Sequence, residues 1–388
     1  KGVFLRSGYR DEAELAAYPV DGVETYNPAV HPNAIDPAAF YDKDGNLWMV
    51  YGSYSGGIFV LAMDEQTGMP EAGQGYGKHL VGGNYNAIEG AFVIYSPDSD
   101  YYYLFWSNAG FAAGDGYNIR VARSRTPDGP YLDAAGNDMT GATVANNYGN
   151  KLLGSHLWSS AFGETSSQYG YNAPGHNSAL YDEELDKYLL FTHTRFPDEE
   201  GRYDNPEAHA VRVHEMWINN DGWLVVSPHR YAPVDGENVT DAEDVAGDYR
   251  LILQSNDSNG DEHESVYVTL NSQGRSIQGQ LTGTYKLYSD DPSRIRLTID
   301  DDTVYEGVAK WQWNVEDARF EVVISALSGA GESLLAAKLP ERSVADVVDD
   351  ISNAIDVAFA NPANPDAMLE VKNDLSLQST GARGAVIS

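Results

Sequence analysis

The segment "NYNAIEGAFVIYSPDSDYYYLFWS", residues 84–107, contains two apolar and aromatic runs on either side of the polar sequence PDSD at 97–100. Such runs, separated by a short polar turn, are typical of a β-hairpin. Glu89 stands at the head of the first run, between Ile88 and Gly90. Glutamate is uncommon in strands and is rarely buried without a partner. Glu89 is therefore either a solvated rim residue or a functional one.

The same unit occurs twice more, as "IDPAAFYDKDGNLWMVYGS" at 35–53 and "GHNSALYDEELDKYLLFTHT" at 175–194. Each copy begins with a turn that carries a carboxylate or a histidine, and Asp36 and His176 take the place of Glu89. Repeats of roughly 40 to 80 residues with about four strands each are typical of β-propeller blades. Equivalent blade ends converge on the propeller axis, so the repeat predicts that Asp36, Glu89 and His176 share one site.

Three further segments follow the propeller domain, which is predicted at 1–233. Residues 245–339 read as an antiparallel β-sandwich or β-barrel, because short alternating strands follow one another without helical periodicity. Residues 343–360 have apolar residues at helical spacing and predict a helix. Residues 366–388 resemble the start of an immunoglobulin-like module. The short link before residue 245 predicts that the second domain packs against the propeller.

Composition excludes several classes of function. The net charge of the 388-residue chain is −33, so its surface repels nucleic acid and acidic membranes and suits a neutral substrate. There are no cysteines, which excludes disulfides and thiolate metal sites. The sequence begins at Lys1 without an initiator Met, and we expect that the natural N-terminus and the C-terminal end both extend further.

Two carboxylates at the mouth of an aromatic-rich funnel suit glycoside hydrolysis. One carboxyl group must be protonated so that it can donate its proton to the leaving oxygen, while a second carboxylate stays ionised. Glu89 has the longer reach and is the better proton donor, and Asp36 is the better fixed charge. Three aromatic residues are candidates for stacking on sugar rings, although a position in the core or at the rim is the commoner role for each: Tyr54, Trp106 and Trp158.

Four motifs together resemble the endo-arabinanases of glycoside hydrolase family 43. They are "NAIDPAAFYDKDGNLWMVYGSYSGGIFVLAMD", "NAIEGAFVIYSPDSDYYYLFWS", "PGHNSALYDEELDKYLLFTHTRF" and "HAVRVHEMWINNDGWLVVSPHRY", in that order over about residues 20–233. The later sequence "YEGVAKWQW" resembles the C-terminal β-barrel of the longer bacterial members. The resemblance implies an all-β fold, a five-bladed propeller plus an antiparallel barrel. It also implies a secreted enzyme that hydrolyses α-1,5-L-arabinan or arabino-oligosaccharides with inversion.

The resemblance also implies roles for single residues. Glu89 would be the general acid, and Asp36 the carboxylate that orients the acid and tunes its pKa. His176 would be the protein ligand of a hydrated Ca²⁺ on the propeller axis. The arabinose subsites would be lined by Ser53 and its expected neighbours Ile35, Tyr54 and Asn86.

This sequence departs from the family pattern at the general base. The family carries it on a blade that would precede residue 20, so about four blades are expected in this chain. The base is then expected on that missing blade, for which a separate N-terminal fragment is one arrangement. A different register would make Asp36 the base, and Asp11 and Asp21 are candidates by position alone.

Two other functions stay open at this stage. One is an exo-acting arabinofuranosidase or xylosidase of the same family, although "GSYSGGIF" at 52–59 and the barrel favour the endo group. The other is a non-catalytic glycan-binding propeller, which needs no general base. Release of reducing ends separates an enzyme from a binder, and product size separates endo from exo action.

Overall fold

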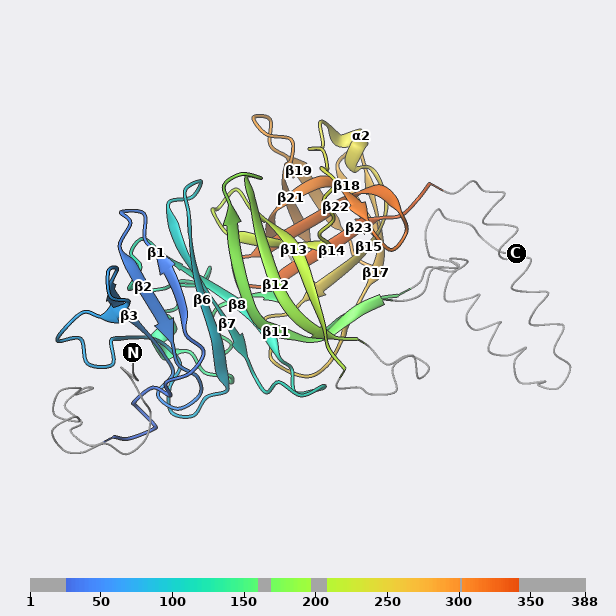
Figure 1. The fold of residues 1–388 in the computed structure, drawn as a ribbon. Coiled ribbons are helices and arrows are strands. Elements are labelled where there is room, and N and C mark those ends of the chain that lie inside the picture. The colour runs from blue at the N-terminus through green and yellow to red at the C-terminus, as the bar shows by residue number, and fades with distance from the viewer. Residues whose placement is uncertain (1–25, 160–168, 197–207, 301, 342–388) are drawn as a thin grey trace, which may run out of the picture.

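The computed structural model describes residues 26–159, 169–196, 208–300 and 302–341. Within these ranges the structure is almost entirely β, as Figure 1 shows: three sheets lie beside a closed barrel. The helical elements among them are short, η1 (Met139–Gly141) and α2 (Ala242–Val245). A search of the same residues finds no helix with the length and apolar character needed to cross a membrane. The predicted helix at 343–360, the predicted module at 366–388, Asp11 and Asp21 lie outside the described residues.

The first sheet follows the first sequence unit and has the order β1-β2-β3-β4, with β5 paired to β3. Its strands are β1 (Ala38–Tyr41), β2 (Leu47–Tyr51), β3 (Ile58–Asp64), β4 (Met69–Pro70) and β5 (Lys78–Val81). Asp36 is separated from β1 by Pro37 alone and lies at the end of the sheet at which β2 ends.

The second sheet contains the hairpin predicted from residues 84–107. Its strands are β6 (Ile88–Ser96), β7 (Tyr101–Asn108), β8 (Asn118–Ser124) and β9 (Asn150–Leu153), in that order. The turn at 97–100 joins β6 to β7, which confirms the predicted hairpin. Glu89 is the second residue of β6, beside a register shift between Glu89 and Phe92.

The third sheet has the order β14-β13-β12-β11-β10-β16. Its strands are β10 (His156–Trp158), β11 (Tyr169–Asp182), β12 (Lys187–Arg195), β13 (Ala210–Ile218), β14 (Leu224–Arg230) and β16 (His263–Glu264). His176 lies inside β11 and not in a turn before a strand, so that detail of the repeat prediction is wrong. The chain nevertheless bends there, because the β11–β12 register shifts between Gly175 and Ser178. Irregularities of this kind re-aim side chains and are common beside active sites.

The strands from β15 onward, apart from β16, form a closed antiparallel barrel, which selects the barrel over the sandwich for residues 245–339. They are β15 (Gly247–Gln254), β17 (Val266–Asn271), β18 (Ser276–Gly279), β19 (Gly283–Leu287), β20 (Arg294–Ile299), β21 (Thr303–Asn314), β22 (Arg319–Ser328) and β23 (Ser333–Lys338). Closure pairs β15 with β23 and leaves no free strand edge.

The barrel packs against the second and third sheets through an apolar core, which confirms the predicted contact between the two parts. This core joins Val225 and Val226 of β14 to Val308, Val323 and other outward-facing barrel residues. Polar contacts flank it: the Ser325 hydroxyl donates to the Val226 carbonyl at 2.6 Å. Separate cores fill the barrel interior and the space between the first and second sheets. The arrangement therefore holds the barrel in a fixed position against the two sheets whose strands β6 and β11 carry Glu89 and His176.

Candidate active site

Asp36, Glu89 and His176 come from three different sheets or sheet edges and lie together. The two ring nitrogens of His176 face the two carboxylates: Nε2 lies 3.9 Å from Asp36 Oδ1, and Nδ1 lies 3.9 Å from Glu89 Oε1. One donor atom from each residue lies within 4.8 Å of the others. The side chains of Asp36 and Glu89 are 21% and 17% exposed, whereas that of His176 is 47% exposed. A cluster of two shielded carboxylates is therefore open to solvent on the histidine side.

The backbone adopts unusual conformations at this centre. Asp36 and His176 have φ values of 53° and 46°, in the left-handed region that residues other than glycine seldom occupy, and Tyr54 has a φ of 47°. Such strained positions collect at functional sites, because the surrounding fold must hold them. Gly90 has a φ of 62°, and its amide N–H points at Asp36 Oδ2 at 3.4 Å. The turn geometry thus aims Asp36 toward the strand that carries Glu89.

Backbone hydrogen bonds fix the segments around the two carboxylates. Gly52 N–H donates to the Ile35 carbonyl at 3.0 Å, and Tyr54 N–H donates to the Ile88 carbonyl at 2.8 Å. These bonds connect the residue before Asp36 and the residue before Glu89 to one loop of the first sheet. Asp36 and Glu89 are therefore held relative to each other by main chain and not only by side-chain contacts.

Glu89 accepts two hydrogen bonds from hydroxyl groups. Tyr117 donates to Oε1 at 2.7 Å and Ser53 donates to Oε2 at 3.4 Å. Tyr117 and Ser53 are buried. Burial, with the Glu89 charge beside it, raises the pKa of the Tyr117 phenol far above its usual range, so the phenol stays a donor. The carboxyl group is consequently oriented on one side by the protein and free on the other.

Tyr117, Ser107 and His193 complete the site and were not found by reasoning from the sequence. The Ser107 hydroxyl accepts the His176 backbone N–H at 2.7 Å. The His193 ring stacks on Tyr117 with centroids 5.9 Å apart. Burial and the neighbouring His209 lower the pKa of His193 to about 4, so this ring is neutral. One signal was available for Tyr117, because it immediately precedes the strand "NIRVARS" at the end of the sheet where Glu89 lies.

The residues predicted to bind substrate divide into two groups. Ile35 is 41% exposed, and Tyr54 is half-buried near Glu89, so both lie where a ligand can reach them. Ser53 is buried against Glu89. The Asn86 amide donates to the Gly83 carbonyl at 2.7 Å and so holds its own loop. Their role toward substrate stays a prediction.

The prediction that Trp106 and Trp158 stack on sugar rings is wrong. Both side chains are completely buried, Trp106 in the core between the first two sheets and Trp158 in the core that includes the barrel. Two aromatic residues that the sequence did not single out are exposed instead, Tyr85 at 57% and Phe111 at 59%. Tyr85 lies before β6 and Phe111 after β7, at the sheet end that carries Glu89.

A cation fits the donor set of this cluster. Ca²⁺ prefers oxygen ligands, and two carboxylates and several waters are compatible with one imidazole in its shell. The three donor atoms are close enough to surround one ion. Asp36, Glu89 and His176 are therefore the residues that would hold or surround it, and the ion would supply a local positive charge.

Two family profiles match adjacent parts of the chain. Residues 21–224 match "Glycosyl hydrolases family 43". Residues 228–336 match a C-terminal lipocalin-like domain that accompanies that family. The boundary between the two matches falls near the end of β14, where the sheets give way to the barrel.

Curated relatives cover most of the chain. It is 43% identical over 350 residues to an extracellular endo-α-(1→5)-L-arabinanase 2 of Bacillus subtilis, a match that covers 87% of this chain and 70% of that protein. It is also 43% identical over 334 residues to an extracellular endo-α-(1→5)-L-arabinanase of Thermotoga petrophila, with 84% and 69% covered.

Solved structures show the same fold. A glycoside hydrolase family 43 protein of Bacillus licheniformis matches with a TM-score of 0.76 and 45% identity over 88% of this chain and 74% of that one. The endo-1,5-α-L-arabinanase of Thermotoga petrophila matches with a TM-score of 0.77 and 40% identity over the same shares of the two chains, 88% and 74%.

Proposed function

Because the chain belongs to glycosyl hydrolases family 43, we propose that it is an extracellular endo-arabinanase that cleaves internal α-1,5 linkages of L-arabinan with inversion. The observation that carries the proposal is the contact of Glu89 and Asp36 with one histidine at the open end of three sheets. Relatives with endo-arabinanase names match across both parts of the chain and support the substrate. The five-bladed propeller belongs to the same proposal.

In this proposal Glu89 is the general acid. Its carboxyl group protonates the glycosidic oxygen of the departing arabinose while the C–O bond breaks. Tyr117 and Ser53 hold the carboxyl group at a fixed orientation by donating to its two oxygens. The solvent-facing side of the Glu89 carboxyl group is then free to contact the substrate.

Asp36 is proposed as the orienting carboxylate and not as the general base. An inverting enzyme separates its acid and base by roughly 6.5 to 9.5 Å, because a water and the sugar must fit between them. Donor atoms of Asp36 and Glu89 lie within 4.8 Å of each other, which is too close for that pair of roles. This distance supports the register in which Asp36 orients Glu89, and it favours a third carboxylate as the base.

The position of that third carboxylate stays a prediction. The chain spans about 70% of the length of its curated relative from Bacillus subtilis. We propose that the base belongs to a further blade, in the same polypeptide or in an associated fragment. An intact mass of the purified active sample, measured without denaturing separation, distinguishes these arrangements.

Arabinan hydrolysis by the purified protein tests the proposed function. We expect new reducing ends from linear α-1,5-arabinan, with oligosaccharides of several lengths as early products. Arabinose or one short product alone would indicate the exo-acting alternative. Binding of arabinan without any release of reducing ends would indicate a glycan-binding protein.

Asp36→Asn is expected to lower kcat by roughly 10- to 100-fold, the usual cost of losing a group that orients a catalytic residue. The amide keeps the shape and can still accept from Gly90 N–H, but it removes the charge beside His176. Steady-state kinetics on linear arabinan measure the effect. Asp44→Asn, on the exposed β1–β2 turn, is the matched control and should retain full activity. Equal kcat values for the two variants would contradict the role of Asp36.

We also propose one Ca²⁺ beside His176. We expect His176→Ala to abolish the tightest calcium site and to lower activity, with little change in melting temperature, because the side chain is half exposed. Isothermal titration calorimetry on chelator-treated protein measures the binding. Glu71→Gln removes an exposed carboxylate elsewhere and controls for scattered weak binding to an acidic surface. Identical calcium isotherms for wild type and His176→Ala would contradict the site.

A further inference from the structure

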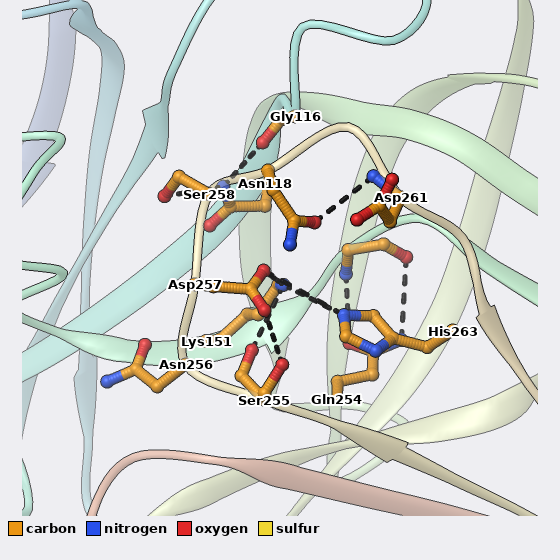
Figure 2. Close-up of polar contacts among 12 residues, drawn as sticks. Gly116, Asn118, Lys151, Gln254, Ser255, Asn256, Asp257, Ser258, Asp261 and His263 are labelled. Atoms are coloured by element: carbon orange, nitrogen blue, oxygen red, sulfur yellow. Dashed lines mark hydrogen bonds and ion pairs between the residues drawn. The ribbon is translucent and has the colours of Figure 1, made fainter.

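A segment of the barrel domain crosses to the second and third sheets and contacts strands that lie beside the active site. This bridging loop, residues 255–265, connects β15 to β17, and its short strand β16 adds to the third sheet by pairing in parallel with β10. Backbone bonds fix it there: His263 N–H donates to the Ser155 carbonyl at 3.1 Å, and Ser265 N–H donates to the Leu157 carbonyl at 2.9 Å. Figure 2 shows the loop beside Gly116, Asn118 of β8 and Lys151 of β9.

Ser258 in this loop contacts the ends of β7 and β8. Its hydroxyl accepts from the Asn108 amide at 2.8 Å and lies 3.4 Å from the Asn118 amide. Asn108 and Asn118 pair with each other in the β7–β8 register, and both are buried. One hydroxyl from the barrel therefore ties together the last pair of residues in this ladder.

The residue that precedes each of these two asparagines contacts the active site. Ser107 precedes Asn108 and accepts the His176 backbone N–H. Tyr117 precedes Asn118 and donates to Glu89. The Asn118 amide also donates to the Gly116 carbonyl at 2.7 Å and so spans Tyr117 on the main chain.

A buried arginine fastens the bridging loop at the same point. The Arg120 side chain is fully buried and donates to the Asp257 carbonyl at 2.8 Å and to the Ser258 hydroxyl at 3.0 Å. It also donates to Asn256 Oδ1. Hydrogen bonds to a buried charged group are stronger than neutral ones and costly to leave unmade. The position of Ser258 is therefore well determined.

The bridging loop packs closely against Gly116, the residue before Tyr117. A Cβ atom at Gly116, where φ is +81°, would lie 2.3 Å from the Ser258 carbonyl and 2.5 Å from the Asn259 carbonyl. A Cβ at Gly260 would lie 1.8 Å from the Gly114 carbonyl. These contacts leave no room for the segment that precedes Tyr117 to move toward the barrel.

We propose that Ser258 of the barrel domain is a positioning residue for the general acid, acting through Asn108 and Asn118 on Tyr117, the hydrogen-bond donor to Glu89. The barrel domain thus completes the active site of the sheets without contacting the substrate. The inference rests on the proposed function for its kinetic consequence. Its structural consequence, the placement of the Tyr117 phenol, is independent of that function.

The first test is kinetic. We expect Ser258→Ala to lower kcat on linear arabinan about tenfold, the effect of a single buried hydrogen bond, with KM changed less than about twofold because the substrate is not touched. Ser258→Thr keeps the hydroxyl and should restore most of kcat. Ser255→Ala is the matched control, since Ser255 lies in the same loop and its hydroxyl bonds to Asp257.

A double-mutant cycle tests the route through Tyr117. Ser258→Ala should have little further effect on kcat in a Tyr117→Phe background, because the hydroxyl that Ser258 positions is then absent. Fully additive losses would overturn the proposed route. A kcat for Ser258→Ala equal to that of Ser255→Ala would overturn the positioning role itself.

The second test needs no activity. 3-Fluorotyrosine placed at position 117 reports the surroundings of the phenol by ¹⁹F NMR. We expect its resonance to shift or broaden in Ser258→Ala and in Glu89→Gln, but not in Ser255→Ala. An unchanged resonance in Ser258→Ala, beside a clear change in Glu89→Gln, would overturn the inference. Failure of the wild type to hydrolyse arabinan would overturn the proposed function and leave this measurement valid.

Discussion

Glu89→Gln is expected to lower kcat on linear arabinan by about 1,000-fold or more, within the range that general acid catalysis contributes. The amide keeps the volume of the carboxyl group, and its oxygen can still accept the Tyr117 hydroxyl that donates to Oε1 in the wild type. It has no transferable proton for the leaving oxygen. The loss should therefore be in kcat with KM little changed, and reducing-end assays over a range of arabinan concentrations measure both.

Two comparisons make this result decisive. Glu71→Gln, which removes an exposed carboxylate far along the first sheet, should behave as wild type. The melting temperature of Glu89→Gln should match that of the wild type, which separates loss of chemistry from loss of fold. If Glu89→Gln retained near wild-type turnover, another residue would have to be the acid.

Gly175→Ala is expected to destabilise the protein strongly, although it adds only one methyl group. A Cβ at position 175 would lie 2.1 Å from Tyr117 Cε1 and 2.2 Å from Cδ1. Tyr117 is buried and stacked on His193, so its ring has no free space to move into. Overpacking of this kind costs about 3 kcal/mol. Chemical denaturation should show this decrease in the free energy of unfolding.

Gly175→Ala should also lower kcat even where the protein remains folded, since the displaced ring cannot donate to Glu89 as before. Gly329→Ala is the matched control, because a Cβ there has no atom within 4 Å. The control should change stability by a few tenths of a kcal/mol at most. Equal stability of the two alanine variants would show that the contact between Gly175 and Tyr117 is looser than the structure has it.

The strand content and the hairpin at residues 84–107 could be predicted from local sequence patterns. These depend on local alternation of apolar residues and on a polar turn, which neighbouring residues alone specify. The internal repeat also placed Asp36, Glu89 and His176 at equivalent ends of their units. Equivalent ends of packed sheets lie near one another. The repeat therefore predicted that these three residues are close in space, which no single motif could do.

The direction in which the aromatic side chains face, and the residues that support Glu89, depend on how the sheets and the barrel pack together. Trp106 is buried because its side of β7 packs against the first sheet, and nothing in its own strand distinguishes that side from a solvent-exposed one. Ser258 lies 150 residues beyond Asn108 and meets it only after the barrel has closed and docked. Such contacts depend on the packing of whole domains, which local sequence patterns do not encode.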